Sequence, residues 1–157
     1  MIELVRASQA EEDCFLRLLQ HYLYEMTAYY PQLPEEDGML PSPFPPIEFG
    51  GGEDGAAPYF LRENGMNAGL ALLSRASYLG EETDHVLCGF TVFPASRRRK
   101  LGSAFGKMIL ESRPGRWEIK YNEKNIPAKK FWHKITAPYH PSLIHLNEVE
   151  TVLIFTV

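Results

Sequence analysis

The chain has 157 residues, of which 45% are hydrophobic and 23% charged, and its formal net charge at pH 7 is −4. This length predicts one domain, residues 1–157, with enough chain to bury a core, and the composition is ordinary for a soluble globular protein. No apolar run approaches the roughly 18 residues of a membrane helix, and the start MIELVRA shows no signal peptide, which argues against membrane and secreted classes. Cys14 and Cys88 lie far apart among apolar neighbours, so we expect two free, buried thiols in a cytoplasmic protein.

The first elements are a short strand and an amphipathic helix. Residues 2–6 alternate and predict a strand, and Ser8 with Glu11 three residues later forms a capping box that starts a helix. The apolar residues of that helix recur on one stripe, which predicts packing against a sheet. They are Phe15, Leu18, Leu19, Tyr22, Leu23 and Met26. The helix ends near Tyr29-Tyr30-Pro31, and we expect this aromatic end to face the substrate.

Residues 31–58 form a long segment of different composition, with seven prolines and five glycines. The segment also holds six acidic residues, namely Glu35, Glu36, Asp37, Glu48, Glu53 and Asp54. A loop of this length in a compact domain is either functional or mobile. Two interpretations are open, the wall of a substrate pocket and a disordered acidic loop.

The remainder of the chain alternates strands and helices. Asn64-Gly65 is a strong hairpin signal between strands 58–63 and 67–76. A strand at 85–93 is followed by a helix that begins near residue 101, a strand at 117–121, a helix at 126–135, and a closing hairpin of strands 142–146 and 150–157. This order predicts an α/β (α+β) fold with a mixed, mostly antiparallel central sheet and helices on both faces.

The central stretch, Phe90–Met108, predicts an anion site. A strand stops at Pro94, four cations follow at 97–100, and a helix opens with Arg99, Gly102 and Ala104 in the spacing R-x-x-G-x-A. The first amides of a helix have no partner within it, and its dipole makes that end positive. Together with the four cations these amides predict a pocket for a phosphate or pyrophosphate, with Gly102 letting the ligand approach the backbone.

These residues resemble the motifs of the GNAT (Gcn5-related) N-acetyltransferases. Val92-Phe93-Pro94 followed by the R-x-x-G-x-A run looks like the family's acetyl-CoA motif, and residues 125–132, NIPAKKFW, look like its N-x-x-A-x-x-[FL]-[YW] helix. The resemblance covers roughly residues 84–136 and points to a branch of predicted acetyltransferases without an assigned substrate. It implies a GNAT-like acyl-CoA N-acyltransferase fold, acetyl-CoA as co-substrate, and an acceptor pocket shaped by the 31–58 segment.

The resemblance also implies which residues bind the cofactor. They are Phe90, Val92, Arg97, Arg98, Arg99, Lys100, Leu101, Gly102, Ser103, Ala104, Asn125 and Trp132. The strand 117–121 should diverge from the strand of Val92 and leave a cleft for the pantetheine arm. Asn125 should hydrogen-bond that arm and Trp132 should contact the thioester, unless Trp132 is simply a core residue.

The catalytic groups of the family are harder to place. Where the family often has a glutamate, this strand reads Leu87-Cys88-Gly89-Phe90, so a base must come from elsewhere. The alternatives are an acid of the 35–54 loop, ordered water, or one of Glu81, Glu82, Asp84 and His85. Trp132 stands in place of the family's tyrosine, which leaves Tyr121 or Tyr139 as proton donors. The candidates for catalysis are therefore Glu82, Asp84, Tyr121 and Tyr139.

The charges are distributed unevenly along the chain. Residues 1–96 carry four Lys and Arg against fifteen Asp and Glu, while residues 97–134 carry twelve against three. One face should therefore meet an anion such as acetyl-CoA, and another something neutral or cationic such as an amine.

Other kinds of site find little support. The run 102–107 lacks the spacing and the hydroxyl of a Walker loop, and the five histidines show no metal-ligand spacing. The acidic chain, with no aromatic residue in its basic run, argues against nucleic acid as a partner. We expect a monomeric or homodimeric N-acetyltransferase acting on a small-molecule or protein amine. The alternative is a non-catalytic acyl-CoA-binding or regulatory module.

Overall fold

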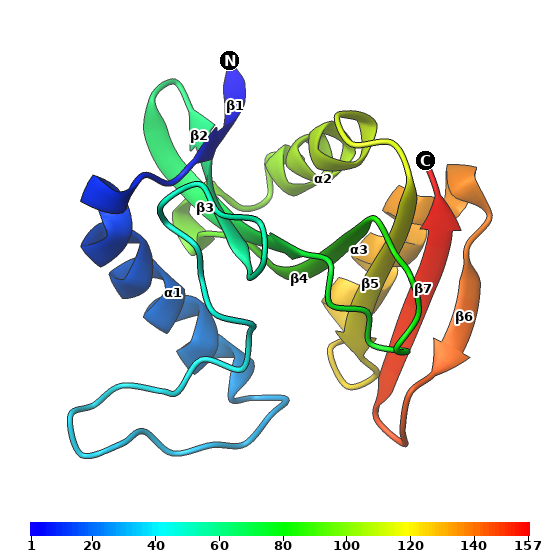
Figure 1. The fold of residues 1–157 in the computed structure, drawn as a ribbon, viewed down its shortest axis with the longest axis horizontal. Coiled ribbons are helices and arrows are strands. Elements are labelled where there is room, and N and C mark those ends of the chain that lie inside the picture. Colours follow the sequence, from blue (N-terminus) through cyan, green and yellow to red (C-terminus); the bar gives the residue numbers. More distant parts are fainter.

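The computed structural model describes all residues 1–157 as one seven-stranded sheet with three α-helices (Figure 1). The strands are β1 (Ile2–Arg6), β2 (Ala57–Glu63), β3 (Met66–Ser74), β4 (His85–Val92), β5 (Arg116–Asn122), β6 (Ser142–His145) and β7 (Glu150–Thr156). The helices are α1 (Glu12–Met26), α2 (Leu101–Glu111) and α3 (Ile126–Thr136), and short 3-10 turns cover Gln9–Glu11, Pro94–Ser96 and Ala137–Tyr139. None of the helices is both long and apolar enough to cross a membrane.

The sheet order is β1-β2-β3-β4-β5-β7-β6, and every neighbouring pair is antiparallel except β4 and β5. Asn64 and Gly65 both have positive φ, 51° and 80°, as the predicted two-residue hairpin turn requires. The parallel pair β4 and β5 is joined through α2, because parallel strands need a long crossover. The mixed, mostly antiparallel sheet is confirmed.

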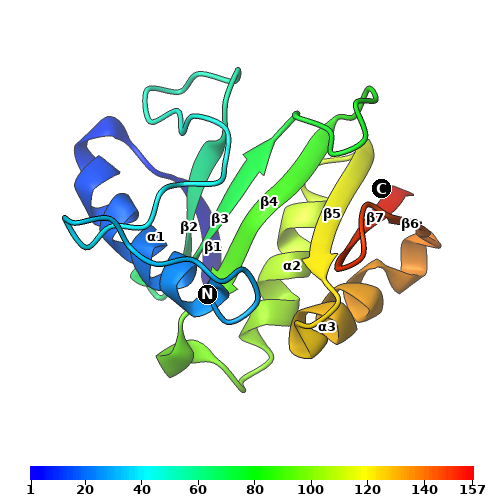
Figure 2. The same cartoon turned by 90° about the horizontal axis from the view of Figure 1, so that it is seen from below.

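Helices cover both faces of the sheet, as predicted (Figure 2). On one face α1 buries Phe15, Leu19 and Leu23 against β2 and β3. On the other face α2 and α3 bury Phe105, Ile109 and Ile135 together with residues of β3, β4, β5 and β7. The predicted capping box precedes α1, since the Ser8 amide and hydroxyl both donate to the Glu11 carboxylate, at 3.1 and 3.0 Å.

β4 is irregular on both of its sides. Towards β3 the register shifts, because Leu72 faces Gly89 while Leu73 faces Leu87, so Cys88 is an extra residue that forms a β-bulge. Towards β5 only residues 85–87 pair, with residues 117–119. Beyond that point the two strands separate, as Figure 2 shows, and the backbone of residues 88–92 has no β5 neighbour. The predicted divergence of these strands is confirmed.

The 31–58 segment packs against α1. Gln20 and the Leu40 main chain exchange two hydrogen bonds of 2.9 Å, and the Tyr24 hydroxyl donates to the Gly38 carbonyl at 2.6 Å. Leu40 and Phe49 are buried in the core on the α1 face. These contacts hold the segment beside the last turns of α1, so the structure favours the pocket wall over a disordered loop.

Buried Glu118 explains why β3 ends at Ser74, two residues before the predicted end. The Glu118 carboxylate is fully buried and accepts hydrogen bonds from the Ser77 hydroxyl, at 2.5 Å, and the Tyr78 amide, at 2.8 Å. A buried carboxylate needs such donors. The chain therefore leaves the sheet after Ser74 and folds over β5, which brings Tyr78 to the α1 face.

Candidate active site

The loop before α2 presents a row of free main-chain donors. After the Pro94–Ser96 turn, Arg98 and Lys100 both adopt the left-handed conformation, with φ of 69° and 58°. The amides of the six residues 98–103 donate to no acceptor in the chain, and the first helical bond runs from Ala104 to the Lys100 carbonyl. Alternating left-handed residues and a helix N-terminus gather such amides around one concave anion site.

The structure divides the four cations of this loop into two pairs. Arg97 is held in place, because its Nε donates to the Val92 carbonyl at 2.7 Å and its guanidinium pairs with Glu25 at 2.7 Å. Arg99 pairs with Glu63 at 3.0 Å. Arg98 and Lys100 are exposed and have no carboxylate partner, so an anion beside the free amides can meet these two without breaking an ion pair.

The side-chain positions of Gly102 and Leu101, in the R-x-x-G-x-A motif, face the protein interior. A Cβ built on Gly102 would lie 3.5 Å from Phe131 and 3.7 Å from Val92, so its side-chain position faces the protein interior. Because 3.5 Å is an ordinary contact distance, this position has room for a methyl group but not for a ligand. Leu101 is likewise buried in the core. Leu101 and Gly102 can therefore meet an anion only through their amides. The Ser103 amide is also free, whereas the Ala104 amide already donates to the Lys100 carbonyl.

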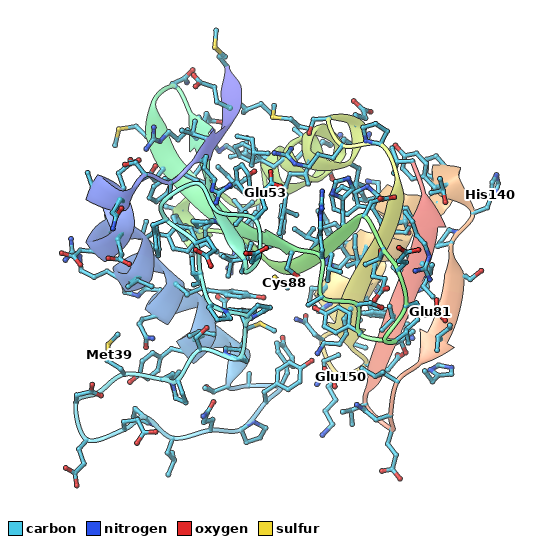
Figure 3. All side chains as sticks on the ribbon, viewed as in Figure 1. Met39, Glu53, Glu81, Cys88, His140 and Glu150 are labelled. Carbon is cyan, nitrogen blue, oxygen red and sulfur yellow. The ribbon has the colours of Figure 1, made fainter.

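A cavity of about 520 Å³ opens where β4 and β5 separate. Its walls come from α1, the 31–58 segment, the turn after β3, β4, β5 and the start of α3. Cys88, at the bulge, lies near the centre of the molecule in Figure 3 and lines this cavity. Burial raises the pKa of the Cys88 thiol to about 11, so it is protonated at neutral pH and is a poor nucleophile.

On the α3 side the cavity is aromatic. The Phe90 ring lies between those of Phe131 and Trp132, at centroid distances of 5.7 and 5.1 Å. Trp132 is only 6% exposed, yet it lines the cavity, so it is a core residue and a wall residue at once. The Asn125 side chain accepts from the Ala128 amide at 3.2 Å and caps α3, which leaves its Nδ2 group free beside the cavity.

Three polar side chains of the cavity come from places that the sequence did not indicate. Tyr22 reaches β4 from α1. Burial raises the pKa of its hydroxyl to about 12, although a hydrogen bond with the Phe90 main chain acts to lower it. Glu25, one turn later, is the only carboxylate among the lining residues. Lys120 lines the cavity from β5. Tyr22 was assigned to the core stripe of α1, and only its position three residues before Glu25 could have suggested a shared face.

Tyr121 is the one predicted catalytic candidate that the structure brings to the cavity. Its hydroxyl lies 2.9 Å from the His133 Nε2 atom, and burial raises its pKa. Tyr30, at the aromatic end of α1, also reaches the cavity, and its hydroxyl donates to Glu150 at 2.7 Å. Helix α1 ends at Met26, earlier than predicted, and Tyr30 in the turn after it lines the cavity. That this end faces the substrate stays a prediction.

The other predicted catalytic candidates lie elsewhere. The Asp84 carboxylate accepts from the Arg116 amide at 2.8 Å, and Glu82 lies beside it. Both precede β4 at the end where it pairs with β5, whereas the cavity opens at the opposite end of the pair. Tyr139 stacks on Phe155 at 5.8 Å. None of these residues lines the cavity, and neither do Glu81, His85 or the six acids of the 31–58 segment.

The structure holds no group of three or more His, Cys, Asp or Glu side chains placed to bind a metal ion. Both cysteines are free thiols.

We compared the sequence and the fold with those of known proteins. No family model matches this chain, and no curated protein matches it in sequence. Solved structures do match. A GNAT-family acetyltransferase from Bacillus cereus superposes with a TM-score of 0.57 at 15% identity, covering 100% of this chain and 96% of its own. The ribosomal-protein-S18-alanine N-acetyltransferase from Escherichia coli gives 0.60 at 13% identity, with 100% and 94% covered.

An aminoglycoside acetyltransferase in complex with coenzyme A and kanamycin gives a TM-score of 0.67 at 14% identity, covering 99% of this chain and 95% of its own. The chain therefore has the fold of the GNAT acetyltransferases, which confirms the fold predicted from the two motifs.

Proposed function

We propose that this protein transfers an acetyl group from acetyl-CoA to a primary amine in the cytoplasm. The observation that carries the proposal is the row of six free amides at 98–103, which includes two residues with unpaired cationic side chains, after the end of β4 that borders the cavity. A pyrophosphate fits such a row, because each amide can donate to an oxygen and the helix dipole favours negative charge. Proteins of this fold solved with acetyl-CoA or coenzyme A support the choice of ligand.

The cavity walls suit the rest of the cofactor. The pantetheine arm carries amide groups, and the backbone of residues 88–92 has no β5 neighbour to bond, so the arm can run beside β4. The free Nδ2 of Asn125 can donate to the arm from the other side. Phe90 and Trp132 supply an apolar wall where a thioester can lie away from water.

The lining residues can also serve the chemistry of acetyl transfer. The amine nitrogen attacks the thioester carbonyl carbon, the carbon–sulfur bond breaks, and the amine's proton leaves while the departing sulfur gains one. Glu25 is the carboxylate that can take the proton from an entering ammonium group. Burial raises the pKa of Tyr22 to about 12, so its hydroxyl is protonated at neutral pH and can supply a proton to the departing sulfur. The Phe90 main chain beside it can stabilise the negative carbonyl oxygen.

Glu25 is engaged by Arg97 when no ligand is bound, and this pair bridges α1 and the phosphate loop. An anion bound at the loop would compete for Arg97 and leave Glu25 free for the amine. We therefore expect ordered binding, with acetyl-CoA before the acceptor. Glu25→Gln should lower kcat for acetyl transfer and leave the affinity for CoA equal or higher, because it releases Arg97.

The proposal is tested by binding and by turnover. At a hundredfold excess over Kd, acetyl-CoA should stabilise the protein by about 2.7 kcal/mol, which for this size is roughly 5–10 °C in Tm. Coenzyme A should act similarly, since both carry the pyrophosphate. If neither moves the Tm, the cofactor assignment is wrong. The protein could instead bind acetyl-CoA and coenzyme A but release no thiol from acetyl-CoA with any of a set of primary amines of varied size and charge. That result would support the non-catalytic module.

A further inference from the structure

The part of the cavity that we assign to the acceptor is mostly apolar, although the N-terminal part of the chain is acidic. We call the portion of the cavity on the α1 face the acceptor chamber, bounded by Tyr22, Leu40, Phe44, Tyr78 and Lys120. The 31–58 segment lines it with apolar residues. Pro41, Pro43 and Pro45 contribute to the wall along with Leu40 and Phe44, while the six acids of the segment do not.

The apolar wall is well defined. The Phe44 ring stacks on the Tyr22 ring, with centroids 6.5 Å apart and planes within 9°. Leu40 is 3% exposed and held by the two hydrogen bonds of its main chain to Gln20. Aromatic rings and prolines offer flat apolar surface at a small cost in conformational entropy. A ligand body that contacts this wall should itself be apolar.

The charges of the chamber are few, and most are already compensated. Lys120 lies 2.8 Å from Glu150 and 4.6 Å above the Tyr78 ring, so its ammonium group has a carboxylate and a ring face as partners. Glu150 lies at the start of β7, at the lower end of the sheet in Figure 3, and is not part of the wall. Glu25 is the single carboxylate of the lining, and it can meet a positively charged acceptor once the anion of the cofactor has taken up its partner Arg97.

From these features we infer that the acceptor is a small primary amine with one positive charge and an aromatic or branched aliphatic body. This inference rests on the proposed function. Its ammonium group meets Glu25, and its body lies on the wall formed by Phe44, Tyr22 and the three prolines. Polyamines and aminoglycosides are disfavoured, because each further ammonium would lose water in the chamber without a carboxylate to replace it.

Direct binding tests this inference separately from turnover. We would saturate the full-length protein with coenzyme A and titrate it by calorimetry with 2-phenylethylamine, isopentylamine, spermidine and kanamycin. The two apolar monoamines should bind at least tenfold more tightly than the two polycations. Equal or tighter binding of spermidine or kanamycin, or no binding of either monoamine, would overturn the inference. Failure of coenzyme A to bind would instead contradict the proposed function.

Two variants of the 31–58 segment test where the body of the acceptor binds. Phe44→Asp adds a carboxylate to the apolar wall, in addition to Glu25 in the cavity. It should weaken the binding of 2-phenylethylamine at least tenfold, and it should reduce or reverse the preference of the protein for 2-phenylethylamine over spermidine. Met39→Asp adds the same charge to the same segment at a side chain that is 43% exposed and outside the cavity, and it should leave the preference unchanged. Identical behaviour of the two variants would mean that Phe44 does not contact the acceptor, which would refute the placement.

Discussion

The phosphate loop allows a quantitative test, because its four adjacent cations differ in their partners. Arg98 and Lys100 have no carboxylate partner, whereas Arg97 pairs with Glu25 and Arg99 with Glu63. We therefore expect Arg98→Ala and Lys100→Ala to weaken coenzyme A binding, and Arg99→Ala to weaken it less, because Glu63 already offsets the charge of Arg99.

The size of the effect follows from the exposure of these side chains. Two unit charges 4 Å apart interact by about 1 kcal/mol in water, and exposed ion pairs measure about 0.2–1 kcal/mol. Each alanine should therefore cost about 0.5–1 kcal/mol, a roughly two- to fivefold loss of affinity, and the double variant about 1–2 kcal/mol. Part of the affinity should survive even in the double variant, because the six amides of the loop remain.

The assay is calorimetric titration with coenzyme A at low and at high salt. Salt should shrink the difference between the wild type and the double variant, since it screens exposed charges. Lys107→Ala is the matched control, because Lys107 is an exposed cation on α2 beyond the free amides. If the double variant binds coenzyme A as tightly as the wild type, or if Lys107→Ala costs as much, the anion does not lie at this loop.

Three further predictions concern packing and pH. Gly102→Ala should leave coenzyme A affinity unchanged and the Tm equal or higher, because its Cβ would lie at ordinary contact distance from Phe131; a tenfold loss of affinity would place the ligand on that side of α2. Trp132→Phe should cost about 1–2 kcal/mol of stability, roughly 3–6 °C in Tm, and also weaken acetyl-CoA; an unchanged affinity would confine Trp132 to the core. Hydrogen bonds from Lys129 and then Thr151 lower the pKa of Glu123 below its ordinary value of 4.5, so their contribution to stability is present above pH 4.5 and is lost as the pH falls through the lowered value. Acid unfolding curves of Glu123→Gln should lack that part of the pH dependence, and a curve parallel to the wild type would show that Glu123 does not contribute.

The amino-acid sequence by itself determined those features of the protein that depend on neighbours along the chain. The Ser8–Glu11 capping box, the Asn64-Gly65 hairpin and the free amides before α2 all involve residues within a few positions of one another. Their geometry follows from local backbone preferences and from the hydrogen bonds that a turn or a helix end leaves open. The order of these elements was enough to predict the mixed sheet and the helices on both of its faces, and the resemblance to the GNAT acetyltransferases predicted the divergence of β4 from β5.

Only the tertiary structure decided which side chains reach the cavity. Glu25 meets Arg97 across 72 residues of sequence. The acids of the 31–58 segment lie outside the cavity, while its prolines and Phe44 line it. Asp84 precedes the end of β4 that pairs with β5, whereas the cavity opens at the other end, where the two strands have separated. Such contacts depend on strand register, on the bulge at Cys88 and on where a long loop is anchored, and these are set by the packing of distant segments, which no local pattern in the chain encodes.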